Sequence, residues 1–301
     1  MFVSNIEGLL VLDKPAGMTS RAVVDRVQRW FPKRTRIGHA GTLDPLATGV
    51  LVLCLGGSTR LIEYIQRMEK VYRTRLLLGA RSDSDDTDGN ITPVPGAVAA
   101  DAATVAACVA GFVGTIEQIP PAYSAVKVSG QRAYDLARRG EDVSLSSHSV
   151  HIYSIQILNY AYPHLELEVR CGKGTYIRSL ARDVGERLGF GALVQELRRT
   201  RIGPFTSEGA LTLDADPETA RARLLPAEMA VAELPRVVLP DSERKRLEQG
   251  QVVAVAESPA GMDKSKEVAV FDAAGGLAAV AMFDSQRRTL QPVKVFHSKN
   301  Q

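Results

Sequence analysis

A single carboxylate, Asp44, lies among glycines, small residues and a proline in the stretch GHAGTLDPLATGVL at residues 38–51. Glycine permits close backbone approach and unusual dihedral angles, and Pro45 restricts Asp44 to an extended or turn conformation. Such a loop presents its acid to a bound molecule. Asp before Pro also caps turns, but that role leaves the density of glycine unexplained. A carboxylate-dependent hydrolase usually needs a second acid, and this stretch supplies none.

The residues that could hold a metal ion show no metal-site spacing. Cys54, Cys108 and Cys171 are far apart and form no C-x-x-C pair, so neither a zinc site nor a disulfide framework is indicated. The acidic run RSDSDDTDGN at residues 81–90 has Asp88 where an EF-hand loop needs Gly and Val94 where it needs Glu. We therefore expect a solvated acidic turn and no metal or other cofactor.

Helical and strand patterns alternate along the first two thirds of the chain. Apolar periodicity and caps predict helices at 19–31, 58–68, 101–114 and 174–189, and strands at 8–15, 50–57, 70–79 and 165–170. Residues 1–230 are interpreted as one mixed α/β domain. Residues 231–301 hold short strands such as EVAVFD and LAAVAMF between Gly, Asp and Pro, which predicts a small β-rich domain.

Bulk composition limits the class of protein. The chain has 301 residues, 45% hydrophobic and 24% charged, as globular proteins do. Its net charge of +3 permits a nucleic-acid partner without demanding one. The N-terminus lacks a signal-peptide pattern and no apolar run reaches membrane-spanning length, so we expect a cytoplasmic protein without a membrane partner. Nothing indicates an oligomer, and a monomer is expected.

The stretch around Asp44 closely resembles the signature of the TruB family of tRNA pseudouridine synthases. Further resemblances follow in the family's order over residues 8–206: LLVLDKPAGMTS, KVYRTRLLLG, QIPPAYSAVKVSGQRAYDLARRG, CGKGTYIRSLARDVGERLG and LVQELRRTRIGPF. The tail is similar to the small RNA-binding PUA module. The resemblance implies an α/β (α+β) fold with a mixed, largely antiparallel sheet flanked by helices, followed by a PUA-like domain at 231–301.

The resemblance also implies a chemistry that a single acid can start. Uridine 55 in the T-loop of tRNA would be isomerised to pseudouridine, with Asp44 as the nucleophile, at C6 of the base or at the sugar. Arg178 would keep this carboxylate ionised against the effect of burial, although an arginine here could instead pair with Asp183. Tyr72 would pack against the base and take the C5 proton.

Other family positions are expected to hold the RNA. Tyr176 matches a second aromatic residue of the pocket, with core packing as the alternative, and Leu197 matches an apolar residue that lines it. A target uridine must leave its stack before an enzyme can reach it, and His39 matches the histidine that fills the gap in the T-loop. Residues 124–147 resemble the family's RNA-binding thumb. Cations are expected to contact phosphates: Lys14, Arg34, Arg36, Lys127, Arg132, Arg138, Arg139, Arg198, Arg199 and Arg201.

Two other functions fit the same motifs. The chain could be an RNA-binding protein or tRNA folding chaperone, which would function fully with Asn at position 44. It could also be a guide-dependent synthase that works within a ribonucleoprotein, but its compact length favours the stand-alone bacterial form, which needs no protein partner and acts on the T-stem-loop of tRNA.

Overall fold

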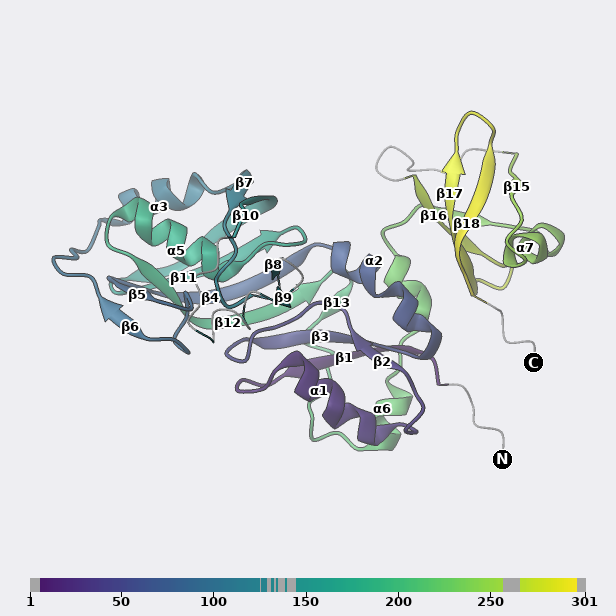
Figure 1. Cartoon of the computed structure of the whole chain (residues 1–301), viewed down its shortest axis with the longest axis horizontal. Helices are drawn as coiled ribbons and strands as arrows, with labels where there is room; N and C mark the ends of the chain where they lie inside the picture. The colour runs from purple at the N-terminus through teal and green to yellow at the C-terminus, as the bar shows by residue number, and fades with distance from the viewer. Residues whose placement is uncertain are drawn as a thin grey trace.

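Two β-sheets dominate the structure, a computed structural model (Figure 1). It describes residues 6–124, 126–128, 131–132, 134, 139, 145–256 and 266–296, without the side chains of residues 127, 128, 131 and 132. Nine strands between residues 8 and 206 form one sheet, and a five-stranded sheet lies toward the C-terminus.

The large sheet is mixed and mostly antiparallel. β12 runs parallel to β3, and the other pairings are antiparallel. The main path follows β1 (Gly8–Lys14), β3 (Thr48–Leu55), β12 (Ala192–Ile202), β4 (Lys70–Leu78), β11 (His164–Cys171), β10 (His148–Ala161) and β7 (Gly114–Gln118), with β2 (Ile37–His39) on β3 and β13 (Phe205–Thr206) on β12. This sheet, with helices on its faces, confirms the predicted fold class.

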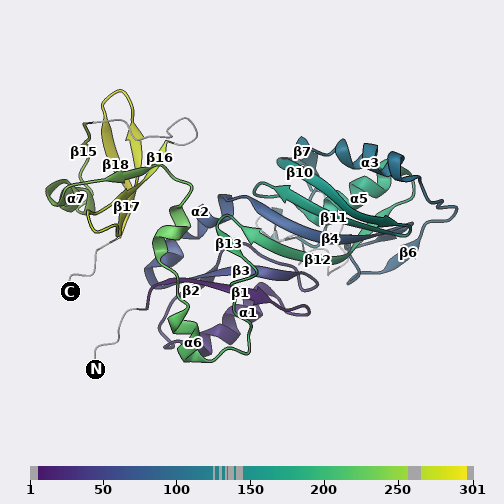
Figure 2. The ribbon, with the colours of Figure 1, turned by 180° about the vertical axis from the view of Figure 1, so that it is seen from behind.

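β3 is an almost continuous apolar run because both of its faces are covered. Alternate side chains, Leu51, Leu53 and Leu55, pack with Val23 and Val27 of α1 (Ser20–Val27). The residues between them face a second core that includes α2 (Ile62–Arg67). Figures 1 and 2 show α1 beside β1 and β3. The strand that follows the Asp44 loop is thereby fixed on two sides.

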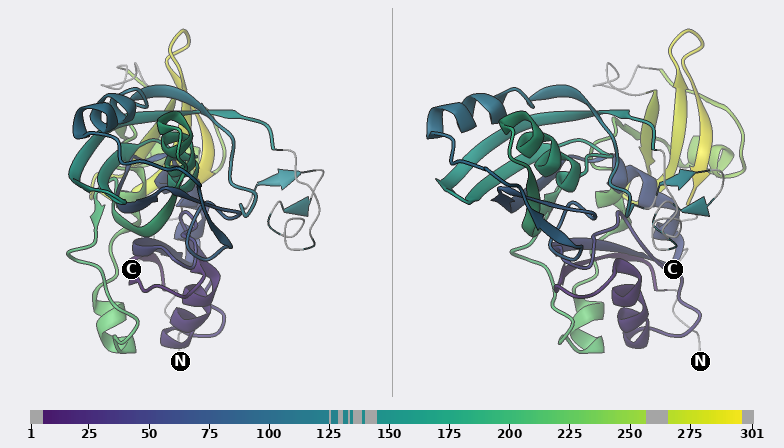
Figure 3. Two further views of the ribbon diagram at one scale, coloured as in Figure 1. Left: turned by 90° about the vertical axis from the view of Figure 1, so that its left-hand side faces the viewer. Right: turned by 60° about the vertical axis from the view of Figure 1, so that its left-hand side comes forward.

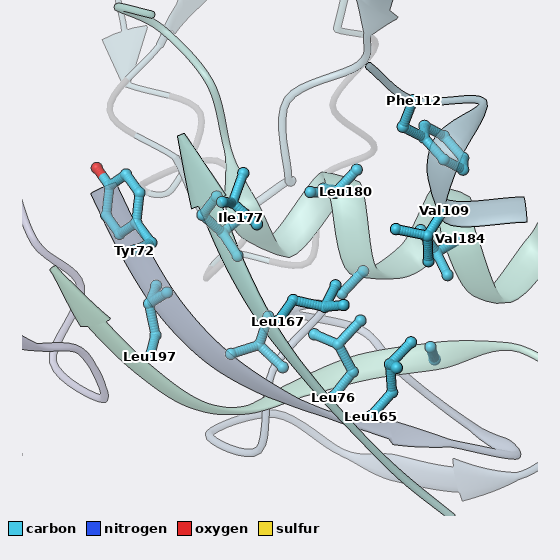
Figure 4. Close-up of a cluster of buried hydrophobic side chains, with 14 of the residues drawn as sticks. Tyr72, Leu76, Val109, Phe112, Leu165, Leu167, Ile177, Leu180, Val184 and Leu197 are labelled. Carbon is cyan, nitrogen blue, oxygen red and sulfur yellow. The ribbon is translucent and has the colours of Figure 1, made fainter. Parts of the chain in front are cut away.

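α3 (Ala102–Ala110) and α5 (Ile177–Leu188) cover one face of the other half of the sheet. Their apolar side chains meet those of β4 and β11 in one cluster (Figure 4). α5 ends at Gly189, whose φ of 85° gives the left-handed cap that glycine adopts without strain. The helix predicted at 174–189 begins three residues later than expected, because a turn connects β11 to α5.

Two predicted helices include a 3-10 segment. The helix expected at 19–31 is α1 followed by the 3-10 helix η1 (Gln28–Trp30). The helix expected at 58–68 begins as the 3-10 helix η2 (Gly56–Leu61) and continues as α2. Gly56 has a φ of 61°, and the Thr59 hydroxyl donates to its carbonyl, which favours a tight turn over an α-helical start.

The five-stranded sheet packs beside α2. Tyr64 of α2 donates to Glu267, and Lys294 pairs with Glu63 across the same contact. Its strands are β14 (Arg236–Val238), β16 (Glu267–Phe271), β17 (Leu277–Asp284), β18 (Thr289–Val295) and β15 (Val253–Ala254), with α7 (Asp241–Glu248) against them. α6 (Pro217–Ala222) and the 3-10 helix η3 (Ala227–Val231) lie on the connection from the large sheet.

Two short hairpins complete the described elements. β5 (Ala80–Ser82) pairs with β6 (Ile91–Pro93) and frames the acidic run. β8 (Lys127–Val128) pairs with β9 (Gln131–Arg132), and in the left view of Figure 3 this ribbon stands clear of both sheets. Most of the segment 124–147, interpreted from the sequence as a thumb, lies outside the described residues.

Candidate active site

Asp44 lies on the loop between β2 and β3, and contacts from three directions hold this loop. The Ser20 hydroxyl at the start of α1 bonds both the N–H and the carbonyl of Leu43, at 2.8 and 3.1 Å. The Pro45 carbonyl accepts from the Gly17 N–H at 2.8 Å. Gly49 has a φ of 98°, and a Cβ there would lie 2.2 Å from the Arg199 carbonyl oxygen. Glycine is therefore required at this close approach, as the sequence predicted.

A cavity of about 730 Å³ opens beside this loop. Five residues expected at the site line it. They come from the Asp44 loop, from β4 and β12, and from α5 and the residue before it. These five are Asp44, Tyr72, Tyr176, Arg178 and Leu197. The cavity wall also includes Lys70, Ser124, His148, Lys173 and Arg199, and the α2 residues Glu63, Gln66 and Arg67.

The Arg178 side chain bonds three separate segments around this cavity. Its side chain is only 4% exposed, and its Nε lies 2.9 Å from Asp44 Oδ2. Its Nη1 donates to the Ser84 carbonyl at 2.9 Å, and its Nη2 donates to the Tyr123 carbonyl at 2.8 Å. Arg178 therefore pairs with Asp44, and the alternative partner weighed from the sequence, Asp183, pairs with Arg182 instead.

Asp86 is a site residue that sequence reasoning missed. The acidic run was expected to be a solvated turn, which is wrong for Asp86, because this residue is 3% exposed. Its Oδ2 lies 3.4 Å from Arg178 Nη1, and its Oδ1 accepts from the Ser84 hydroxyl at 2.5 Å. A buried charge needs a partner, and Arg178 supplies it. The serine two residues before Asp86 is a local signal of a turn in which the two side chains bond each other.

Burial raises the pKa of Asp44 above its usual value. The Arg178 guanidinium opposes this effect, the Asp86 carboxylate adds to it, and Lys14 lowers the pKa slightly. The Asp44 side chain remains one third exposed, toward the cavity. Asp44 is thus a carboxylate with restricted hydration that is paired with Arg178 and exposed to the cavity. Such a carboxylate is suited to attack a bound molecule.

Tyr72 and Leu197 lie where the apolar core meets the cavity. Both are buried, and Figure 4 shows them with Ile177 at one end of the apolar cluster. Burial raises the pKa of the Tyr72 phenol, whereas the neighbouring Arg199 cation lowers it. Tyr72 is therefore a buried core residue that also lines the cavity.

Of Tyr176 and His39, only Tyr176 lines the cavity. Tyr176 is half-buried, immediately precedes α5 and lines the cavity. His39 ends β2 and is not among the residues that line the cavity. Its Nδ1 is buried without a hydrogen-bond partner in the described part of the chain, and burial lowers its pKa.

The cations expected to contact phosphates have different surroundings. Arg34 and Arg36 are exposed and form no ion pair within the described residues. Arg198 pairs with Asp13 at 2.7 Å, and Arg201 pairs with Glu69. Arg139 is exposed. The side chains of Lys127 and Arg132, and all of Arg138, lie outside the described residues.

Arg199 and Lys14 differ from the expected phosphate contacts because both are buried. Arg199 is 2% exposed and donates to the carbonyls of Val50 and Gly41, at 2.9 and 3.1 Å. Lys14 is 0% exposed, and its ammonium donates to the carbonyls of Pro15, Met18 and Pro45. Burial lowers the pKa of Lys14 to about 8. Both cations therefore bond backbone carbonyls of the loop that carries Asp44.

We expect Lys14→Met to lower kcat while the salt dependence of RNA binding stays unchanged. Without the ammonium, the Pro45 carbonyl loses one donor, and the residue next to Asp44 is less firmly placed. Measuring kcat and the slope of log K against log salt concentration separates the two roles. A phosphate contact predicts the opposite result, a slope shallower by about 0.9 with kcat retained.

The described residues contain neither a metal-binding cluster of His, Cys, Asp or Glu side chains nor a membrane-spanning helix. No cluster of three or more His, Cys, Asp or Glu side chains in that part of the chain could hold a metal ion. None of its helices is long and apolar enough to cross a membrane.

Known proteins match this chain over most of its length. The family models described as TruB family pseudouridylate synthase (N terminal domain) and tRNA pseudouridylate synthase B C-terminal domain match residues 29–177 and 178–240. A tRNA pseudouridine synthase B of Syntrophotalea carbinolica is 43% identical over 81% of each chain. One of Dehalococcoides mccartyi is 40% identical over 97% of each chain.

Solved structures resemble the fold as well. A chain of a Cbf5-Nop10-Gar1 complex superimposes with a TM-score of 0.76 at 28% identity, covering 97% of this chain and 85% of that one. A chain of an H/ACA RNP bound to a substrate RNA containing 2'-deoxyuridine gives 0.76 at 26% identity, covering 97% and 86%.

Proposed function

This chain belongs to the TruB family of pseudouridylate synthases, and from that premise we propose that it isomerises uridine 55 in the T-loop of tRNA. It is a tRNA pseudouridine synthase, an isomerase. The observation that supports the proposed chemistry is the Asp44–Arg178 ion pair, 2.9 Å long, at the wall of a cavity that Tyr72 and Tyr176 also line.

The reaction breaks the bond between N1 of uracil and C1′ of the ribose and forms a bond from C5 to C1′. The proton on C5 leaves, and N1 gains a proton, so the atoms balance without an oxidant or water. We assign Asp44 as the nucleophile, either at C6 of the base or at C1′. Arg178 favours its ionised form, and burial limits the hydration that would weaken attack.

Tyr72 is assigned to the C5 proton. A phenol accepts a proton only as it gains phenolate character, which burial opposes and a nearby cation favours. Arg199 lies close enough to lower the pKa of Tyr72. Arg199 therefore has two effects here, since it also holds the Gly41 carbonyl of the Asp44 loop.

The cavity fits a nucleotide that has left its stack. Its volume of about 730 Å³ falls in the range of small-molecule sites, about 300–1,000 Å³. Tyr176 would stack on the base, Leu197 would pack against it, and His39 would enter the space that the base leaves. Opening the stack costs about a few kcal/mol, which contacts along the RNA must supply. Segment 124–147 and the second sheet, as a PUA-like domain at 231–301, are proposed to provide some of them.

The experiment that tests this function uses the purified protein with an unmodified tRNA transcript, without added metal, guide RNA or second protein. Pseudouridine is mapped by chemical labelling and primer extension. Formation at position 55 alone supports the proposal. Pseudouridine at another position corrects the site, and tight binding without any pseudouridine sinks the stand-alone activity.

We also propose that the chain acts as a monomer without a protein partner. The support is its greater identity to curated tRNA pseudouridine synthase B chains, 40% over 97% of each, than to the Cbf5-Nop10-Gar1 chain at 28%. A tRNA substrate also favours a cytoplasmic location.

We expect the double variant Arg34→Gln, Arg36→Gln to weaken tRNA binding mainly at low salt. Both side chains are exposed and unpaired within the described residues, so phosphates can reach them. Two lost phosphate contacts reduce the slope of log K against log salt concentration by about 1 to 2. The matched control is Arg73→Gln with Arg75→Gln, because Glu168 and Glu166 already pair with these arginines. Equal slopes for the two variants would exclude the phosphate contacts.

A further inference from the structure

Two cross-strand neighbours at the edge of the large sheet reach the same turn in front of α5. Gln118, the last residue of β7, pairs in register with His148, the first residue of β10. Their side chains both bond the turn at residues 174–176, which leads directly to Arg178. Neither residue was singled out from the sequence.

Gln118 makes two opposite hydrogen bonds with one residue. Its Oε1 accepts from the Tyr176 N–H at 3.0 Å, and its Nε2 donates to the Tyr176 carbonyl at 3.2 Å. The amide is suited to this pairing because it carries a donor and an acceptor side by side. Gln118 is completely buried. Tyr176 is the N-cap residue of α5, and its side chain makes no capping hydrogen bond. Gln118 therefore fixes the backbone from which the Tyr176 ring projects.

His148 fixes the same turn from the cavity side. Its Nε2 lies 3.1 Å from the Gly174 carbonyl, and since a carbonyl only accepts, this nitrogen is the donor. Its ring meets the Tyr176 ring edge to face, with centroids 6.0 Å apart and planes at 88°. This is a favourable aromatic geometry. Gly174 has a φ of 83°, so the turn needs glycine to bring its carbonyl to His148.

The attachment of β7 to α5 does not depend on these two side chains. The carbonyl of Ile119, next to Gln118, accepts from the Ser179 hydroxyl at 2.8 Å and from Arg182 Nη2 at 2.9 Å. These bonds hold the end of β7 on the first turns of α5. The bonds of Gln118 and His148 thus determine the turn and the Tyr176 ring rather than the packing of strand on helix.

We propose that Gln118 and His148 act as a pair of positioning residues that set the direction of the Tyr176 ring in the cavity. The proposal rests on the proposed function, in which a flipped uridine lies between Tyr176 and Asp44. A base stacked on a ring whose backbone and edge are both held reaches the nucleophile in one orientation. Catalytic geometry is sensitive to errors of this size, because a displacement of about 1 Å can cost about 100-fold in rate.

The test is a double-mutant cycle on the purified full-length protein with a tRNA transcript. Gln118→Met keeps the size and removes both hydrogen bonds, and His148→Phe keeps the ring edge and removes the bond to Gly174. Each is made alone and in a Tyr176→Ala background, and kcat, KM and the dissociation constant for tRNA are measured. His148 is only half-buried, so its variant keeps the test possible if Gln118→Met fails to fold.

We expect each variant alone to lower kcat by about 5- to 20-fold, with the tRNA dissociation constant within about twofold. In the Tyr176→Ala background, the same changes should lower kcat by less than about twofold, because residues that act through one group are not additive. Ser179→Ala is the matched control, since it removes a bond between β7 and α5 without touching the turn.

Other outcomes would contradict either the positioning role or the proposed function. Equal effects of Gln118→Met and His148→Phe with and without the Tyr176 ring would overturn the positioning role, as would an unchanged kcat in both variants. An unmutated protein that forms no pseudouridine would contradict the proposed function itself.

Discussion

Asp44→Asn will abolish pseudouridine formation and leave tRNA binding within about twofold. Asparagine has the shape of aspartate but no nucleophilic charge, so the rate should fall by at least about 10⁴-fold, as in other enzymes that lose a nucleophile. Binding should persist because Arg178 keeps its bonds to the Ser84 and Tyr123 carbonyls. The measurement is single-turnover pseudouridine formation together with filter binding of the same transcript.

The control for this prediction is Asp25→Asn. Asp25 is an exposed acid of α1 in an ion pair with Arg21, remote from the cavity lining. The same change of charge there should leave both rate and affinity within about twofold, since exposed ion pairs contribute little. A residual rate in Asp44→Asn above about one per cent of the unmutated rate would mean that another group starts the reaction.

Arg178→Gln will shift the acidic limb of the pH–rate profile to higher pH. Burial and Asp86 raise the pKa of Asp44, and Arg178 is the main group that lowers it. Removing the guanidinium therefore raises this pKa further, and a smaller fraction of Asp44 is ionised at any given pH. At pH 7 the rate should fall by about 100-fold or more, and part of it should return as the pH rises. The measurement is kcat/KM from pH 5 to 9.

Two further variants separate charge from fold in this prediction. Arg182→Gln removes an arginine one turn further along α5, where it pairs with Asp85 at 2.8 Å outside the cavity, and the limb should not move. Asp86→Asn removes a carboxylate that raises the pKa of Asp44, so any movement of the limb should be toward lower pH. A limb that stays in place in Arg178→Gln would show that Asp44 is ionised without its help.

The sequence predicted the residues whose chemistry depends on local pattern. Asp44 was visible because glycine and proline around it define a loop, and Gly49 does have the predicted close approach. Arg178 was expected near Asp44 from its match to the family motif, because local pattern alone allowed a surface arginine paired with Asp183, and the structure shows the pair with Asp44. Apolar periodicity predicted the alternating helices and strands, the family resemblance implied the mixed, largely antiparallel sheet, and the structure confirms that fold class.

The residues that were missed depend on tertiary contacts that no local pattern records. Asp86 has exposed acids as neighbours in the sequence, and its burial accompanies contacts with α5 and with Val194 of β12. In the sequence, Lys14 and Arg199 resemble RNA-binding cations. In the structure, both bond carbonyls of the Asp44 loop. Gln118 and Tyr176 are 58 residues apart, so their pairing becomes visible only when β7 reaches α5.

The short helix α2 belongs to the cavity and to the contact between the two sheets at once. Glu63 and Arg67 line the cavity, and they pair with Lys294 and Glu267 of the second sheet. An anion in the cavity competes with Glu267 for Arg67, so the two equilibria are thermodynamically linked. By reciprocity, any ligand that loosens the second sheet by a given factor is itself bound more tightly by that factor when the sheet is already loose. Docking of the second sheet and affinity for an anionic substrate would then share one coupling free energy, to which Glu63 and Arg67 of this six-residue helix contribute.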